Sequence, residues 1–175
     1  MPSHRMHHDR KALPVALVLA LTLSPHGHAG VPPALDFELS DGARFVRLAA
    51  LPERPTVVNF WRADCPPCLR ELPLLAALAS QGTARVITIA LQRPSETANA
   101  PEHVLNALRP PLLALHGPSE PRGLLARFGN RSGALPHTVI LNAHRHSCAH
   151  HSGEINAHWL QQQLALCAAQ KAPSR

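Results

Sequence analysis

Two continuous runs of apolar and β-branched residues, at 56–61 and 85–91, stand out from the mixed pattern around them. Such runs are typical of strands that are covered on both faces of a sheet. A shorter run at 138–141 predicts a third strand. Upstream, residues 36–39 and 43–46 alternate apolar and polar positions around a Ser-Asp-Gly turn, a pattern that predicts a β-hairpin.

Helical periodicity fills the segments between these runs. Leucines at every third position predict a helix over 69–79, with Pro73 inside it, and Asn156 is a good N-cap for a final helix. Weaker patterns predict a helical turn at 48–51, helices at 101–108 and 123–128, and strands at 111–115 and 148–151. The order of these elements predicts an α/β domain with a central mixed β-sheet flanked by helices and an N-terminal β-hairpin extension.

The N-terminus has the pattern of a secretory signal peptide. Basic residues precede an apolar run at 12–23, and Gly27-His28-Ala29 places small residues at the two positions that a signal peptidase inspects. We therefore expect residues 1–29 to be a signal peptide, residues 30–175 to form the domain, and the protein to be periplasmic. The apolar run is short for a membrane span, so an uncleaved membrane anchor is the less favoured alternative.

Charge and composition argue against one class of partner. The formal net charge is +6, but the basic residues are scattered singly and only 3% of residues are aromatic. Nucleic-acid-binding proteins usually gather basic side chains in a patch and stack bases on aromatic rings. We therefore expect no nucleic-acid partner.

The chemistry of the chain centres on Cys65-Pro66-Pro67-Cys68, which follows the first buried strand and opens the helix after it. The N-terminus of a helix favours a thiolate over a thiol, and two intervening residues let both sulfurs join in one small ring. This spacing favours a redox dithiol. Half of a structural zinc site and an inert disulfide are the alternatives, although Cys148 and Cys167 form no second Cys-X-X-Cys motif.

The corner formed by the strand, Trp61 and the Cys-X-X-Cys motif, together with Pro73 and the later segment 133–139 (GALPHTV), resembles thioredoxin-fold proteins. The hairpin, the signal sequence, the Asn-Phe-Trp strand end and the Cys-Pro-Pro-Cys motif are similar to the exported TlpA/ResA-like thiol-disulfide oxidoreductases. The resemblance covers about residues 34–168. It implies a thioredoxin-like fold, in which Pro136 is a cis-proline against the active-site disulfide and the backbone of Leu135 binds an extended substrate segment.

The resemblance also implies a function. Such proteins reduce disulfides in other exported proteins, among them apocytochrome c and copper-site proteins, and draw electrons from a membrane thiol-relay protein. Cys65 would attack the target disulfide and Cys68 would resolve the mixed disulfide. We expect a monomer that needs no cofactor besides its own redox-active disulfide.

Several neighbours could tune the thiols. Family members typically carry an aromatic residue where this chain has Asp64, whose carboxylate would raise the pKa of Cys65 unless Arg62 offsets it. Thioredoxins often place a buried acid where this chain has Asn59, so that role is vacant in the sequence. Glu96 and His137 are candidate proton partners, against the simpler reading of Glu96 as a solvated carboxylate. Further tuning candidates are Trp61, Pro66 and Pro67.

The remaining cysteines and a histidine cluster leave alternatives open. Cys148 and Cys167 could form a structural disulfide, stay as two thiols or form a second redox centre. Histidines flank Cys148 closely enough to raise a metal-site hypothesis, and with it a rival function, a copper-binding or metal-delivery module. We favour a solvated hairpin because no rigid spacing fixes the geometry of these ligands. They are His144, His146, His150 and His151.

Overall fold

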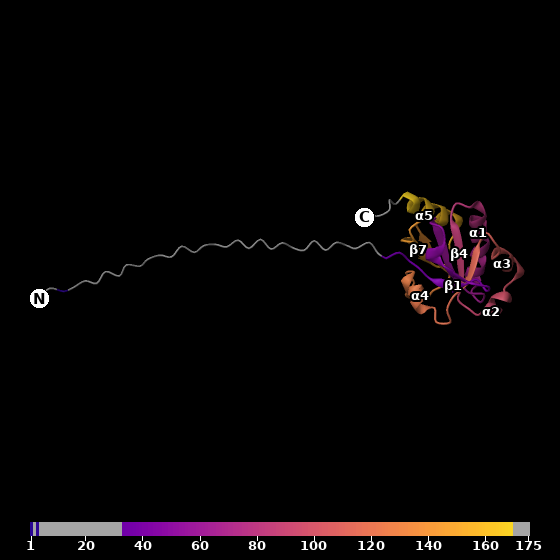
Figure 1. Ribbon diagram of the computed structural model, residues 1–175, viewed down its shortest axis with the longest axis horizontal. Coiled ribbons are helices and arrows are strands. Elements are labelled where there is room, and N and C mark those ends of the chain that lie inside the picture. The colour runs from indigo at the N-terminus through magenta and orange to yellow at the C-terminus, as the bar shows by residue number, and fades with distance from the viewer. Residues whose placement is uncertain (2, 4–32, 170–175) are drawn as a thin grey trace. The chain divides into compact units, whose positions relative to one another are not determined.

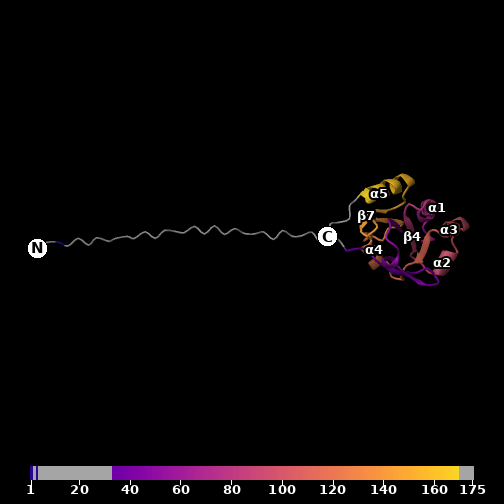
Figure 2. The same cartoon turned by 45° about the horizontal axis from the view of Figure 1, so that its top comes forward.

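The computed structural model describes residues 1, 3 and 33–169, and these contain one seven-stranded mixed sheet in the order β2-β1-β5-β4-β3-β6-β7 (Figures 1 and 2). Strands β3, β4 and β5 are parallel, and the remaining pairs are antiparallel. The strands are β1 (Glu38–Ser40), β2 (Phe45–Arg47), β3 (Thr56–Trp61), β4 (Arg85–Ala90), β5 (Leu113–His116), β6 (His137–Leu141) and β7 (Ser147–Ser152).

Helices cover both faces of the sheet. Helix α1 (Pro66–Gln81), α3 (Glu102–Ala107) and α5 (Ala157–Ala169) contribute to one hydrophobic cluster, and α4 (Arg122–Arg127) contributes to the other (Figure 1). A 3-10 turn, η1 (Leu48–Ala50), joins β2 to the loop before β3, and a short helix, α2 (Pro94–Ala98), follows β4. The domain therefore has three layers, with the sheet in the middle.

Strand β3 positions the Cys-X-X-Cys motif that follows it. All six of its residues are buried, and its side chains alternate between the two clusters. Val57 and Trp61 pack on the α1 face, whereas Val58 and Phe60 pack on the α4 face. Since β3 pairs with β4 on one side and β6 on the other, its carboxyl end lies in the middle of the sheet edge. The chain turns there directly into α1.

The predicted fold class, the α/β thioredoxin-like fold with a mixed central sheet and an N-terminal hairpin, is confirmed. The segment 92–100, for which no helix or strand was predicted, contains α2. There Glu96 reaches back to accept a hydrogen bond from the backbone N–H of Arg93 (2.8 Å), which caps the helix. The predicted Asn156 cap is present, since its Oδ1 accepts from the N–H of Trp159 (2.9 Å).

The predicted signal peptide lies outside the described residues except for Met1 and Ser3, so it stays a prediction. Among the helices of the described residues, none has the length and the apolar composition needed to cross a membrane.

Candidate active site

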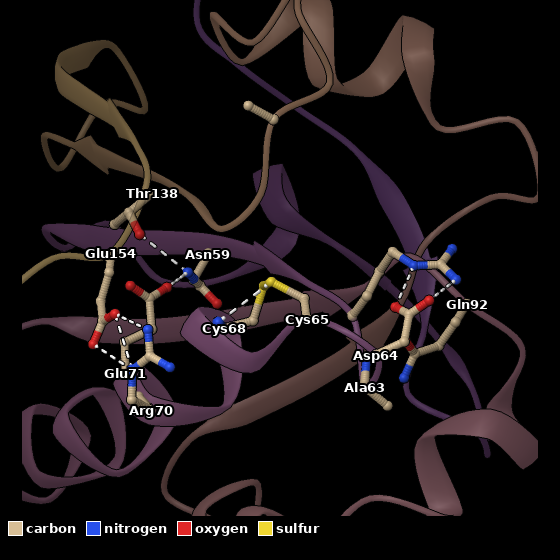
Figure 3. Close-up of a disulfide and its surroundings, with 12 residues drawn as sticks. Asn59, Ala63, Asp64, Cys65, Cys68, Arg70, Glu71, Gln92, Thr138 and Glu154 are labelled. Carbon is tan, nitrogen blue, oxygen red and sulfur yellow. Dashed lines mark hydrogen bonds and ion pairs between the residues drawn. A yellow bond between two sulfur atoms is a disulfide. The ribbon is translucent and has the colours of Figure 1, made fainter.

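Cys65 and Cys68 are joined by a disulfide at the N-terminus of α1 (Figure 3). Cys65 is the N-cap residue, and its sulfur accepts a hydrogen bond from the backbone N–H of Cys68 (3.3 Å). Pro66 and Pro67 occupy the first two helical positions and have no N–H, so the N–H of Cys68 is the first donor that the helix offers. The helix dipole and this donor both favour negative charge on the sulfur of Cys65.

The two sulfurs differ in access. Cys65 is partly exposed, whereas Cys68 is fully buried in the cluster on the α1 face, next to the buried Trp61. A visiting thiol or disulfide can therefore reach Cys65 but not Cys68. This difference matches the order of attack that was expected from the sequence.

Asp64, the residue that departs from the family pattern, is neutralised by its neighbour. The guanidinium of Arg62 binds both carboxylate oxygens of Asp64, with Nε–Oδ1 at 2.8 Å and Nη2–Oδ2 at 2.9 Å. The hydrogen bond from Arg62 lowers the pKa of Asp64, so this carboxylate is ionised at neutral pH, but with its charge balanced. The Arg62–Asp64 pair, which the sequence suggested as an offset to the carboxylate, is thus present in the structure.

The loop before Cys65 is hydrogen-bonded to the segment that follows β4. The backbone N–H of Ala63 donates to Oε1 of Gln92 (2.6 Å), and Nε2 of Gln92 donates to the hydroxyl of Thr97 (3.0 Å). Figure 3 shows Gln92, Ala63 and Asp64 on one side of the disulfide. These bonds hold the approach to the motif at a fixed distance from α2.

A buried carboxyl group that the sequence analysis missed lies on the other side of the disulfide. Glu71 is 1% exposed and lies one helical turn after Cys68. Its Oε1 accepts from Nδ2 of Asn59 (2.5 Å), and Nδ2 of Asn59 also donates to the hydroxyl of Thr138 (3.0 Å), as Figure 3 shows. Burial raises the pKa of Glu71 to about 7. Asn59 occupies the strand position as the sequence indicated, and the buried acid that the sequence analysis did not anticipate comes from α1.

The second carboxylate oxygen of Glu71 connects the helix to a distant loop. It accepts from the backbone N–H of Ile155 (3.1 Å), in the segment between β7 and α5. The neighbouring Arg70 pairs with Glu154 on the surface, Nη2 to Oε2 at 2.6 Å. Two adjacent contacts thus fix this loop against the start of α1.

The sequence does contain a signal for Glu71. Cys68, Leu72 and Leu75 are among the buried positions of α1, and Glu71 shares their face. A lone carboxyl on the apolar face of a helix indicates a buried charge that needs partners or a raised pKa.

The Leu135–Pro136 peptide bond is cis. Because β6 runs antiparallel to β3 with His137 opposite Phe60, the two preceding residues lie beside the end of β3 and the start of the motif. Leu135 packs against the cluster that contains both site cysteines. In the described part of the chain, no other residue forms a backbone hydrogen bond with Leu135.

Two candidate proton partners have other contacts. Glu96 binds Arg93 through both its carboxylate oxygens, and these bonds lower its pKa. His137 is buried on the α4 face, with Nδ1 at 2.8 Å from the hydroxyl of Ser152 and Nε2 at 2.9 Å from the carbonyl of Phe128. Burial lowers the pKa of His137. Strand alternation turns its side chain away from the disulfide, so the structure gives neither residue a contact with the cysteines.

Cys148 and Cys167 form a second disulfide, which joins β7 to α5. Cys167 is buried and Cys148 is partly buried within the cluster on the α1 face. Of the three readings left open by the sequence, the structure contains the disulfide.

The histidines around Cys148 do not converge. His150 packs against His137 on one face of β7, and His151 packs against Trp159 on the other. Nδ1 of His144 lies 3.5 Å from a carboxylate oxygen of Glu53. Within residues 33–169, no group of three or more His, Cys, Asp or Glu side chains is arranged to hold a metal ion.

Several solved structures of other proteins share this fold. The exposed lipoprotein thioredoxin of Streptococcus pneumoniae is 22% identical, covers 75% of this chain and 98% of its own, and superposes with a TM-score of 0.57. StoA of Bacillus subtilis is 17% identical over 75% and 98% of the two chains, with a TM-score of 0.55. A secreted disulfide oxidoreductase of Mycobacterium tuberculosis is 18% identical over 74% and 94%, with a TM-score of 0.57.

At these identities the superpositions establish the fold. No curated protein sequence matches the chain significantly. The AhpC/TSA family matches residues 32–146, more than half of the chain. The site thus consists of a Cys-X-X-Cys disulfide at the start of the first long helix of a thioredoxin-like fold. The chain belongs to the AhpC/TSA family.

Proposed function

We propose that this protein is an exported thiol-disulfide oxidoreductase of the TlpA/ResA-like group, which reduces disulfides in other exported proteins. One observation carries the proposal: the Cys65–Cys68 disulfide caps a helix, with one sulfur accessible and the other buried. This arrangement suits a dithiol that exchanges with a visiting protein.

The reaction begins with both cysteines reduced. The thiolate of Cys65 attacks one sulfur of the target disulfide, and the target's other sulfur leaves as a thiolate and takes up a proton. The thiolate of Cys68 then attacks the sulfur of Cys65 and releases the target's first sulfur as a thiol. Two electrons pass from the protein to the target, and the Cys65–Cys68 disulfide is formed.

Glu71 is suited to the proton transfers of this cycle. Its pKa of about 7 lets the carboxyl group hold or release a proton at neutral pH, and it lies one turn after Cys68 on the same buried face. Asn59 orients one carboxylate oxygen and Ile155 the other. We assign Glu71 as the group that takes the proton of Cys68 when this thiol attacks.

The cis peptide bond supports a role for Leu135 and Pro136 in substrate binding. Proline cannot donate a hydrogen bond, and the backbone N–H and C=O of Leu135 are available to an extended chain that passes the disulfide. Such pairing is the main-chain recognition of β-augmentation. The target cysteine would thereby be held against Cys65.

Further elements of the proposal rest on the sequence and on similar proteins. The predicted signal at 1–29 favours export to the periplasm, and a similar structure belongs to a secreted disulfide oxidoreductase. Since each turnover consumes two electrons in an oxidising compartment, a membrane thiol-relay donor must restore the dithiol. Apocytochrome c and copper-site proteins are the proposed targets, and a monomer is the proposed working form.

The decisive experiment is a redox titration of the Cys65/Cys68 couple against dithiothreitol and glutathione, followed by mass spectrometry of alkylated peptides. A strongly reducing couple, together with reduction of insulin in the presence of dithiothreitol, is the expected result. A strongly oxidising couple would instead assign the protein to disulfide donation. A couple that does not respond to either reagent would contradict the proposal.

A further inference from the structure

An open groove with a volume of about 600 Å³ lies on the α4 side of the cis-proline loop. Its lining includes Arg62 and Leu135, which also belong to the active site. From there it extends over the start of α4 and the loop at 130–133. The groove therefore continues the surface that a substrate chain would follow after passing Cys65.

The far walls of the groove carry two arginines. Arg122 lies at the N-terminal end of α4 and Arg131 lies in the loop after it, and both are exposed. Among the ion pairs of residues 33–169, none includes either of these side chains. Glu120 is the acidic residue of the lining, whereas Arg62 is already paired with Asp64. Apart from the Arg62–Asp64 pair, two arginines and one glutamate thus line the groove, which leaves it an excess of one positive charge.

The loop that carries Arg131 is held in place. Asn130 is buried and its Nδ2 donates to the carbonyl of Ala134 (2.7 Å). Its Oδ1 accepts from the N–H of Gly133 (2.8 Å) and from the hydroxyl of Ser132 (3.1 Å). Since these bonds tie the loop to the residue before Leu135, the position of Arg131 is fixed relative to the redox site.

We propose that this groove binds an acidic segment that flanks the target disulfide of the substrate protein, with Arg122 and Arg131 as its specificity-determining residues. The inference rests on the proposed reductase function and names the class of substrate sequence that this site prefers. Charge complementarity carries the choice of occupant, because oppositely charged groups at the rim of an interface steer the encounter and select the partner.

The test uses three synthetic disulfide-containing peptides that are identical except for a flanking segment of acidic, neutral or basic residues. The protein is reduced with dithiothreitol and desalted, and single-turnover rates are measured at low ionic strength. We expect the acidic peptide to react about fivefold faster than the neutral one, and the basic peptide to react more slowly than the neutral one. The preference should shrink in 0.5 M NaCl because salt screens exposed charges.

The variant R122Q/R131Q should lose the preference, so that its rates with the acidic and the neutral peptide become equal. The control is R109Q/R127Q, which removes two exposed arginines outside the groove and should keep the preference. Equal rates with all three peptides, or an equal loss in both variants, would overturn the acidic-segment proposal and leave the reductase function standing. If the reduced wild type reacted with none of the peptides, the proposed function itself would fail.

Discussion

The two disulfides of this chain lie in contrasting surroundings. Cys65–Cys68 closes a ring at a helix N-terminus, with one accessible sulfur and a buried carboxyl group one turn after it. Cys148–Cys167 joins a strand to a helix across 19 positions of the sequence. The first has the features of a site that exchanges, and the second has those of a cross-link that constrains the chain.

The contrast indicates that the surroundings of a disulfide, more than the bond itself, decide whether it exchanges with a partner or only cross-links the chain. A helix N-terminus and an accessible sulfur lower the cost of a thiolate and admit a partner. A longer closed loop removes more conformations from the unfolded chain.

The largest expected effect is on activity. Cys65→Ser should reduce the rate of insulin reduction by at least about a thousandfold, because the attacking sulfur is lost. The double variant Cys148→Ser/Cys167→Ser should keep the activity of the wild type at a temperature where both are folded. Retained activity in Cys65→Ser would contradict the catalytic role of the first disulfide. A loss of activity in a double variant that circular dichroism shows to be folded would contradict the purely structural role of the second.

The second expected effect is on stability. Cys148→Ala/Cys167→Ala should lower the free energy of unfolding by about 3 kcal/mol, as expected when a cross-link that closes a loop of this length is removed. Urea unfolding of the oxidised proteins, followed by tryptophan fluorescence, measures the change. A loss below about 1 kcal/mol would contradict the structural role of this disulfide.

The third prediction concerns the carboxyl group that distinguishes the first disulfide. Burial raises the pKa of Glu71 from 4.5 in its ordinary state to about 7 in the folded protein, so the folded state binds the proton more tightly than the unfolded chain does. Stability should therefore fall as the pH rises through this range, by roughly 2 to 3 kcal/mol between pH 5 and pH 8.

The variant Glu71→Gln has no carboxyl group to titrate and should lack this part of the pH dependence. Urea unfolding of both proteins at pH 5 and pH 8, with both disulfides oxidised, gives the difference directly. Parallel pH dependences in the wild type and the variant would show that Glu71 does not titrate in this range.

The smallest expected effect is at Asp64. Asp64→Asn frees the guanidinium of Arg62 beside the thiol, which should favour the thiolate of Cys65 and raise its rate of alkylation by iodoacetamide at pH 6 about twofold. Asp41→Asn is the matched control, because Asp41 pairs with Arg44 in the β1–β2 hairpin and should leave the rate unchanged. A slower reaction in Asp64→Asn would show that the carboxylate assists Cys65.

Features that depend on residues close together in the chain could be predicted from the sequence, whereas features that depend on residues far apart in the chain could not. The Cys-X-X-Cys corner and the three main strands follow from residues close together in the chain, and they were predicted correctly. Glu71 was missed because its burial depends on Asn59 and on Ile155, which lies far away in the sequence.

His137 shows the opposite error. It is adjacent to Pro136 in the sequence, yet successive residues of a strand point to opposite faces, so its ring packs with Phe60 on the α4 face. The same alternation places His150 and His151 on opposite faces of β7, so these two rings do not share a site. Proximity along a strand is thus a poor guide to shared chemistry unless the face of each side chain is known.

The burial of Cys68 fixes the regiochemistry of any covalent adduct with a partner. Only one of the two sulfurs can be linked to another polypeptide, so every trapped conjugate has the same connectivity. A chain in which the inner thiol is replaced by a hydroxyl would accumulate this single species. Mass spectrometry of these mixed disulfides would identify the physiological target proteins and the cysteine of each that is bound to Cys65.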